Sequence, residues 1–252
     1  MDHKAQKHVK TGFSKLTPVY IIGLLMAIVL LFVTLNPPCF FYGRMNDDLK
    51  DSELFDDMAS GKSFCFLGDS ITAGTLTRGV SWHHHLDKYI KGHISDFSCD
   101  GWTSQSLVDA MEDIPASDVY VIAIGINDVL YANKGLGSST AEEYTGKLKI
   151  LADHLKENSP NTKLYFITPW IFYGLPEDFL ERRSNYSDAL AEWCEEEGYI
   201  CVDPNPLIDS VIEKDGIKRY MANNFHPNAR WGVGLFSYAV LEAEHQRRIQ
   251  TS

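Results

Sequence analysis

The chain has 252 residues, of which 44% are hydrophobic and 23% charged, which is typical of one globular domain with a sizeable core. No repeat or low-complexity tract points to a solenoid or a fibrous protein. The formal net charge is −11. Because affinity for nucleic acid comes mostly from clustered Lys and Arg, this charge argues against a nucleic-acid partner.

One uncharged segment near the N-terminus does not fit a soluble domain. Residues 19–35 read VYIIGLLMAIVLLFVTL and are bounded by prolines on both sides. At about 1.5 Å per residue the segment spans about 25 Å, the short end of the range for a membrane helix. A cleaved signal peptide is the alternative, but the apolar run is long for one and no small-residue cleavage site follows it. We therefore expect a single transmembrane anchor.

The charges on either side of this segment predict its orientation. Four lysines precede it, and mostly acidic residues follow it. Lys and Arg are enriched on the cytoplasmic side of membrane helices. We therefore expect a cytoplasmic basic head over residues 1–18, the anchor over 19–35, an acidic stalk over 36–61 and a folded domain over 62–252, which lies outside the cell and is held at the cell membrane by the helix.

Beyond the stalk, short apolar runs alternate with helical patterns. In chain order we predict a strand at 63–67, a helix near 82–90, a weaker strand at 95–99, a helix at 104–111, a strand at 119–124, a helix at 141–158, a strand at 163–168, a helix at 177–197, a strand at 199–202 and a last helix near 229–248. This alternation favours an α/β fold, in which helices cover both faces of a parallel sheet. The ligand site of such a sheet lies beyond the carboxyl ends of its strands.

Four short motifs occupy those positions: Gly68-Asp69-Ser70, Asp100-Gly101, Gly125-Ile126-Asn127-Asp128, and Asn223-Asn224-Phe225-His226 before the last helix. In this order they resemble the SGNH (GDSL) hydrolase superfamily, whose members carry a nucleophilic Ser, an oxyanion Gly, an oxyanion Asn and a catalytic His in such blocks. The resemblance covers roughly residues 62–245. It implies a three-layer, flavodoxin-like α/β fold with a five-stranded parallel sheet, and esterase or related acyl-transfer chemistry.

The residue types agree with that chemistry. Ester hydrolysis through a serine needs a hydroxyl, a base and donors for the oxyanion, and it needs no cofactor. Ser70 is the candidate nucleophile and His226 the candidate base. The backbone N–H groups of Ser70 and Gly101 and the side-chain amide of Asn127 are the candidate oxyanion donors, with a helix N-terminus expected behind Ser70. Each of these residues alone could also have a purely structural role in a helix cap or a turn. Their joint occurrence favours a catalytic role in an esterase.

Two other features receive structural roles. For Asp69 and Asp128 we expect helix-capping or turn hydrogen bonds. The run His83-His84-His85 invites a metal assignment, but consecutive residues of a helix point about 100° apart and cannot converge on one ion. We therefore predict no metal site.

One position departs from the family pattern. The resemblance implies an aspartate three residues before the catalytic histidine, and this chain has Asn223 there. An amide carries no charge, and its NH₂ group can favour the wrong imidazole tautomer. Two alternatives stay open: a Ser-His dyad oriented by a backbone carbonyl, or an atypical triad of Ser70, His226 and Asn223.

Aromatic residues near the strand ends suggest the substrate. Trp102, Trp170 and Tyr173 are candidates for substrate binding, because aromatic faces suit sugar rings and acyl chains. With an anchored domain facing outward, the leading substrate is an ester of a cell-surface carbohydrate, foremost an O-acetyl group. A lipid or lysophospholipid esterase, a sugar O-acyltransferase and a catalytically weak carbohydrate-binding domain are the alternatives.

The five cysteines do not form a CxxC pair, so a zinc site of that kind has no support. If Ser70 and Gly101 serve one oxyanion, Cys65 and Cys99 differ in height by about three residues. That offset of roughly 10 Å is too large for a disulfide. The pairing of Cys194 and Cys201 is left open.

Overall fold

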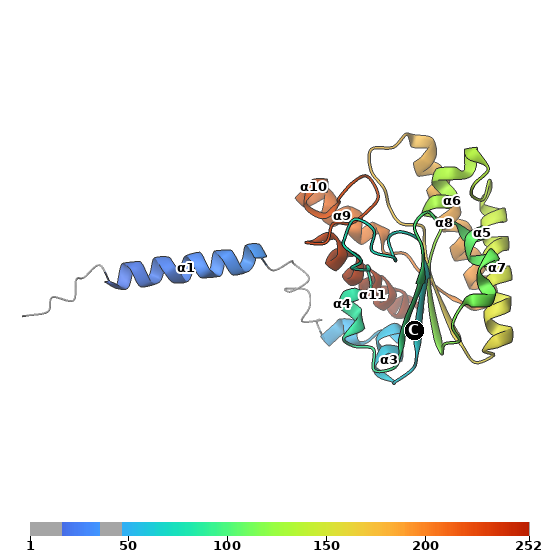
Figure 1. The fold of residues 1–252 in the computed structure, drawn as a ribbon, viewed down its shortest axis with the longest axis horizontal. Coiled ribbons are helices and arrows are strands. Elements are labelled where there is room, and N and C mark those ends of the chain that lie inside the picture. Colours follow the sequence, from blue (N-terminus) through green and yellow to red (C-terminus); the bar gives the residue numbers. More distant parts are fainter. Residues whose placement is uncertain (1–16, 36–46, 252) are drawn as a thin grey trace, which may run out of the picture. The chain divides into compact units, whose positions relative to one another are not determined.

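The structure is a computed structural model that describes residues 17–35 and 47–251 (Figure 1). The chain divides into two units, with the boundary between Pro37 and Pro38. Among the residues that the structure describes, the first unit contributes one helix, and the second contains the sheet and the other helices. Most of the predicted basic head and residues 36–46 of the predicted stalk, with Cys39, lie outside the described residues.

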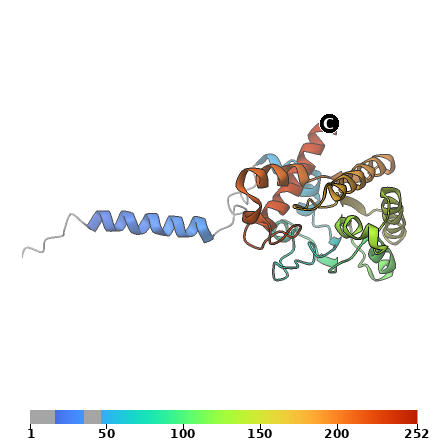
Figure 2. The ribbon, with the colours of Figure 1, turned by 90° about the horizontal axis from the view of Figure 1, so that it is seen from above.

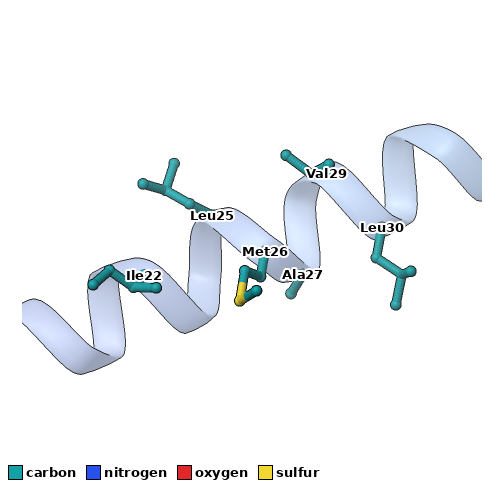
Figure 3. Close-up of a pocket in the computed structure, with 6 residues that line it drawn as sticks. All are labelled: Ile22, Leu25, Met26, Ala27, Val29 and Leu30. Atoms are coloured by element: carbon teal, nitrogen blue, oxygen red, sulfur yellow. The ribbon is translucent and has the colours of Figure 1, made fainter.

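Helix α1 spans Thr17–Leu35, and its side chains are described for residues 20–31. Figure 3 shows six of them, all apolar: Ile22, Leu25, Met26, Ala27, Val29 and Leu30. Within the described residues, no helix has both the length and the apolar character needed to cross a membrane. The described residues therefore do not show the transmembrane helix that the sequence predicts over residues 19–35.

A five-stranded parallel sheet forms the centre of the second unit, which confirms the predicted α/β fold. Its order is β2-β1-β3-β4-β5. The strands are β1 (Phe64–Gly68), β2 (Ile94–Ser98), β3 (Val119–Ala123), β4 (Lys163–Ile167) and β5 (Ile200–Val202). Every residue of β1 and β3 is buried, because helices cover both faces of the sheet. Strand β2 lies at an edge and is only half-buried, which explains its weaker apolar pattern.

Two groups of helices enclose the sheet and give the fold three layers (Figure 1). One group contains α5 (Ser104–Asp109), α6 (Ile126–Tyr131), α7 (Ala141–Asn158) and α8 (Glu177–Glu197), which pack on one another. The other contains α3 (Glu53–Ala59), α4 (His84–Asp87), α9 (Asn205–Asp215), α10 (Ile217–Tyr220) and α11 (Gly232–Thr251). Figure 2, seen from above, also shows the red C-terminal helix apart from the green helices.

The helices α7 and α8 have the predicted bounds, whereas two other predictions need correction. The pattern at 82–90 forms only the single turn of α4, and the ring of His83 is buried, stacks on Phe66 and contacts Asp87 and Asp96. The last helix begins at Gly232 and not near residue 229, because the side-chain oxygen of Asn228 accepts the N–H groups of residues 230–232 and holds them in a turn. The short helices α6 and α9 have no counterpart in the prediction.

The sequence predicts an acidic stalk up to Gly61, but the folded unit already includes the helical turn Asp47–Lys50 and α3. Leu54 and Met58 of α3 are buried in the core. Asp57, only 5% exposed, forms ion pairs with Lys62 at 2.6 Å and Lys163 at 2.8 Å. It also accepts a hydrogen bond from the Tyr165 hydroxyl at 2.7 Å. Part of the acidic stretch is therefore an internal ion cluster.

The strand register separates two cysteines more than predicted. Cys65 of β1 is opposite Ser95 of β2, so Cys99 lies four positions further along. At about 3.3 Å per residue this offset is about 13 Å, beyond the reach of a disulfide. Cys65, Cys99, Cys194 and Cys201 are all free thiols.

Candidate active site

The segments that follow β1 and precede α11 bring two reactive side chains together at the carboxyl end of the sheet. Ser70 lies two residues after β1, and His226 lies six residues before α11. The Nε2 atom of His226 is 2.8 Å from the Ser70 Oγ. Each residue is 7% exposed. This is hydrogen-bond geometry for a serine nucleophile and its general base.

The chain around Ser70 forms turns over residues 70–78 and not the predicted helix. Asp69 organises the first turn: its Oδ1 accepts the N–H of Ile71 at 2.9 Å. Oδ2 of Asp69 has no hydrogen-bond partner among the described residues. Burial raises the pKa of the Asp69 carboxyl to about 7, partly offset by the Ile71 hydrogen bond. Asp69 thus has the turn role expected of it, and Ser70 gains no help from a helix N-terminus.

The three residues predicted to stabilise the oxyanion have N–H groups that are available to a ligand. Within residues 47–251, the backbone N–H groups of Ser70 and Gly101 donate to no protein acceptor. Gly101 has a φ of +76°, a conformation that favours glycine. The Nδ2 atom of Asn127 donates to the carbonyl of Trp102 at 2.9 Å, which occupies one of its two N–H groups. Its second N–H remains for a ligand.

Gly125 sets the position of Asn127 at the end of β3. Its φ is +123°, and a Cβ there would lie 2.8 Å from Pro169 Cγ and 2.8 Å from the Tyr144 hydroxyl. Only glycine therefore lets the chain turn here into α6, whose second residue is Asn127.

The side chain of Asn223 holds the ring of His226. Its Oδ1 accepts the N–H groups of Phe225 at 3.0 Å and His226 at 2.7 Å. Backbone N–H groups only donate, so these two bonds fix which end of the amide is the oxygen. Nδ2 then lies 3.1 Å and Oδ1 3.2 Å from the ring Nδ1 of His226. The Asn223 amide therefore lies beside the ring of His226, the position that the atypical triad requires.

The electrostatic surroundings of His226 favour its neutral form. Burial lowers the pKa of the imidazole and outweighs the negative charge of Asp100, which acts in the opposite direction. A neutral imidazole is the form that can accept the proton of Ser70.

The loop after β4 supports the histidine segment. The backbone N–H of Tyr173 donates to the carbonyl of Asn224 at 2.8 Å. Asn205, which is 2% exposed, shapes this loop: its Oδ1 accepts the N–H of Ile171 at 2.6 Å and its Nδ2 donates to Thr168 at 2.9 Å. Asn205 is not among the residues predicted from the sequence, although its place in the polar segment Asp203-Pro204-Asn205 after β5 was a usable signal.

The three predicted substrate-binding aromatics have different positions. Trp170 is 1% exposed and packs on Trp82 and Phe236, so its ring belongs to the core and is not available to a substrate. Tyr173 is half-buried and its hydroxyl donates to Asp209 at 3.3 Å. Trp102 is half-buried against Phe97 and directly follows Gly101. Trp102 and Tyr173 therefore stay candidates, and the prediction for Trp170 is wrong.

Across the described part of the chain, no group of three or more His, Cys, Asp or Glu side chains is arranged to hold a metal ion. His83 instead lies with its Nδ1 2.7 Å from Asp87 and its Nε2 3.3 Å from Asp96.

Solved structures share this fold. Axe2, an acetylxylan esterase from Geobacillus stearothermophilus, is 20% identical with a TM-score of 0.63, over 74% of this chain and 95% of that chain. LAE5, an alpha/beta hydrolase enzyme from the metagenome of Lake Arreo, Spain, is 21% identical with a TM-score of 0.62, over 74% and 96%. Catalytic mutants of Axe2 replace a serine, an aspartate or a histidine.

No curated protein matches this chain. Residues 66–230, more than half of the sequence, match the GDSL-like Lipase/Acylhydrolase family. The chain therefore belongs to this family of ester hydrolases.

Proposed function

We propose that this protein hydrolyses an ester on a cell-surface carbohydrate, foremost an O-acetyl group, with Ser70 as nucleophile and His226 as base. The observation that carries the catalytic part is the 2.8 Å contact between Ser70 Oγ and His226 Nε2. The carbohydrate part is supported by the likeness in fold to an acetylxylan esterase and by the half-buried ring of Trp102 beside Gly101.

In the first half of the reaction, Ser70 Oγ attacks the carbonyl carbon of the ester while Nε2 of His226 takes the hydroxyl proton. The carbonyl oxygen becomes an oxyanion, which accepts hydrogen bonds from the N–H groups of Ser70 and Gly101 and from the Asn127 amide. The tetrahedral intermediate collapses to an acyl-serine. The sugar hydroxyl leaves with the proton that His226 holds.

In the second half, water attacks the acyl-serine and gives up a proton to His226. The same three donors stabilise the second oxyanion. Collapse releases the carboxylic acid, and the proton returns from His226 to Ser70. A sugar hydroxyl in place of water would make the same residues an acyltransferase, so product analysis must distinguish the two outcomes.

Asn223 makes this triad weaker than one with a carboxylate. It gives the imidazolium that forms during the reaction no opposing charge. Both ends of its amide lie near the ring Nδ1, with Nδ2 at 3.1 Å and Oδ1 at 3.2 Å, so Asn223 does not select the tautomer that accepts the Ser70 proton as firmly as a carboxylate would. We therefore expect a slow esterase.

The test is acetate release from O-acetylated polysaccharides by the purified protein, compared with longer-chain esters and lysophospholipids. The proposal expects acetate release that Ser70→Ala abolishes, together with labelling of the wild type by a fluorophosphonate. Preference for a lysophospholipid would refute the carbohydrate substrate, and transfer of acetyl to an added sugar would indicate an acyltransferase. Activity that survives Ser70→Ala would refute the nucleophile.

We also propose that the catalytic domain lies outside the cell and is tethered to the membrane by residues 19–35. The support is the uncharged run in the sequence with four lysines before it and acidic residues after it. Protease added to intact cells is expected to remove the domain. Digestion only after lysis would refute this topology.

A further inference from the structure

Asp128 directly follows the oxyanion candidate Asn127, yet its carboxylate does not cap its own helix. The residue is fully buried. The four hydrogen bonds to its carboxylate come from two serines of other segments. Ser104 donates its N–H at 2.9 Å and its hydroxyl at 2.6 Å, and Ser138 donates its N–H at 3.1 Å and its hydroxyl at 2.8 Å. The expected local capping role is therefore replaced by contacts between segments.

These bonds join the two segments that carry the oxyanion donors. Ser104 is the first residue of α5 and lies three residues after Gly101. In the same segment, the carbonyl of Trp102 accepts the amide of Asn127 at 2.9 Å. The chain over residues 101–104 is thus tied to the start of α6 at two points, of which Asp128 is the buried one.

The third segment closes the cluster from the other side. Ser138 lies in the loop before α7, and the Nζ of Lys147 donates to its hydroxyl at 3.2 Å. Gly137 lets this loop approach, because a Cβ there would lie 2.7 Å from the Cα of Asp128. The carboxylate is therefore enclosed by groups that donate to it, which compensates for burying its charge.

We infer that Asp128 is a positioning residue that holds the loop of Gly101 and the helix of Asn127 in one arrangement, so that donors from both converge on the same oxyanion. The inference rests on the proposed oxyanion roles of Gly101 and Asn127. A carboxylate suits this task because both of its oxygens accept. An amide in its place would turn an NH₂ group toward the N–H of Ser104 and push the loop away.

The test is Asp128→Asn, assayed with p-nitrophenyl acetate so that the result does not depend on the natural substrate. Active sites are counted by fluorophosphonate titration, and kcat is expressed per titrated site. A misplacement of about 1 Å costs about 10²-fold in rate, so we expect kcat to fall by about 10- to 100-fold. KM is expected to change little, because the oxyanion forms only in the transition state.

Asp118→Asn is the matched control. Asp118 also accepts the N–H and the hydroxyl of one serine, Ser63, at 2.8 and 2.7 Å. It immediately precedes β3, at the end of the strand opposite to Asn127. Asp118 is exposed and accepts two such bonds where Asp128 accepts four. Its replacement perturbs the same kind of carboxylate–serine contact far from the oxyanion donors, so kcat per titrated site is expected to stay at the wild-type value.

Equal kcat values for the wild type and Asp128→Asn overturn the inference, and so does a lower Tm with unchanged kcat. If Asp128→Asn does not fold, Ser104→Ala and Ser138→Ala replace it, since each removes one hydroxyl bond to the carboxylate. A several-fold loss of kcat at constant KM in both supports the inference, and unchanged kcat in both overturns it. Asn127→Ala distinguishes a failure of the proposed oxyanion hole from a failure of the role of Asp128. Unchanged kcat in Asn127→Ala refutes the oxyanion hole. A loss of kcat in Asn127→Ala with unchanged kcat in Asp128→Asn refutes only the role of Asp128.

Discussion

Replacing Asn223 with aspartate tests how the ring of His226 is held. In the present geometry one end of the amide accepts the backbone N–H groups of Phe225 and His226, and the other end lies 3.1 Å from the ring Nδ1. In Asn223→Asp, one carboxylate oxygen keeps the backbone bonds. The second oxygen takes the place of the NH₂ group and accepts the Nδ1 proton of His226. The variant thus completes the triad without moving the backbone.

The size of the gain follows from the bond that forms. A hydrogen bond to a charged group contributes about 1.5–3 kcal/mol, and each 1.36 kcal/mol changes a rate tenfold. Asn223→Asp is therefore expected to raise kcat near neutral pH by about 10- to 150-fold. The loss of about 10⁴-fold on the converse change in a serine protease sets an upper limit. The new carboxylate also favours the charged ring, so the apparent pKa of His226 rises and the acidic limb of the pH–rate profile moves to higher pH.

The assay is a pH–rate profile of the wild type, Asn223→Asp and Asn223→Ala with an acetyl ester. Asn228→Asp is the control for charge alone. The Asn228 oxygen likewise accepts backbone N–H groups, and the residue is only two positions from His226, but its other amide end donates to the carbonyl of Arg219 and not to the imidazole. A carboxylate at 228 adds the same charge without the hydrogen bond to the ring.

The reasoning is refuted if Asn223→Asp is neutral or slower while folded and Asn223→Ala is nearly silent. That pair of results would mean that the amide does not engage the ring. An equal gain in Asn228→Asp would show that charge near His226, and not a bond to Nδ1, controls the rate.

Three further predictions concern the base, the loop after β3 and the ion cluster. Because burial lowers the pKa of His226, the neutral base persists in acid, and the acidic limb of kcat/KM is expected to have its midpoint below the usual value of about 6.5; a midpoint above it would contradict this. Gly125→Ala introduces a clash at a φ of +123°. It is expected to lower kcat and to reduce the free energy of unfolding in urea by about 1–3 kcal/mol. The control is Gly146→Ala, at an exposed helix position with open space around it, which is expected to stabilise the protein by up to about 1 kcal/mol. Burial disfavours the charged form of Asp57, but hydrogen bonds from Lys163, Lys62 and Tyr165 outweigh burial and lower the pKa of the carboxyl. The charged carboxylate therefore stabilises the fold above about pH 4, and this stabilisation is lost as the pH falls through the lowered pKa. Asp57→Asn is thus expected to cost about 3–5 kcal/mol at neutral pH and less in acid, and a loss no larger than that of the exposed Asp56→Asn would contradict this.

Features that depend on local pattern and on motif order can be predicted from the amino-acid sequence alone. The uninterrupted apolar runs of β1 and β3 are readable because both faces of these strands are buried. The long amphipathic helices α7 and α8 are predictable because their apolar residues recur with the helical period of 3.6 residues. Ser70 and His226 were identifiable because chemistry in a parallel sheet concentrates after its strands, so the order of four short motifs already indicated one site.

Other features depend on which distant segments meet. The sequence predicts that acidic residues 47–57 belong to a solvated stalk. In the structure, Lys62 and Lys163, which lie outside this stretch, form ion pairs with Asp57. The sequence predicts that Trp170 contacts the substrate, whereas in the structure its ring packs on Trp82 and Phe236.

The contact between Ser70 and His226 also required the tertiary structure, because these two residues are 156 positions apart along the chain. Asp128 shows the same limit, since its partners are 24 and 10 residues away along the chain. Periodicity and motif spacing report the neighbours of a residue along the chain. Burial and hydrogen-bond partners depend on its neighbours in space, and only the packing of the helices on the sheet decides those.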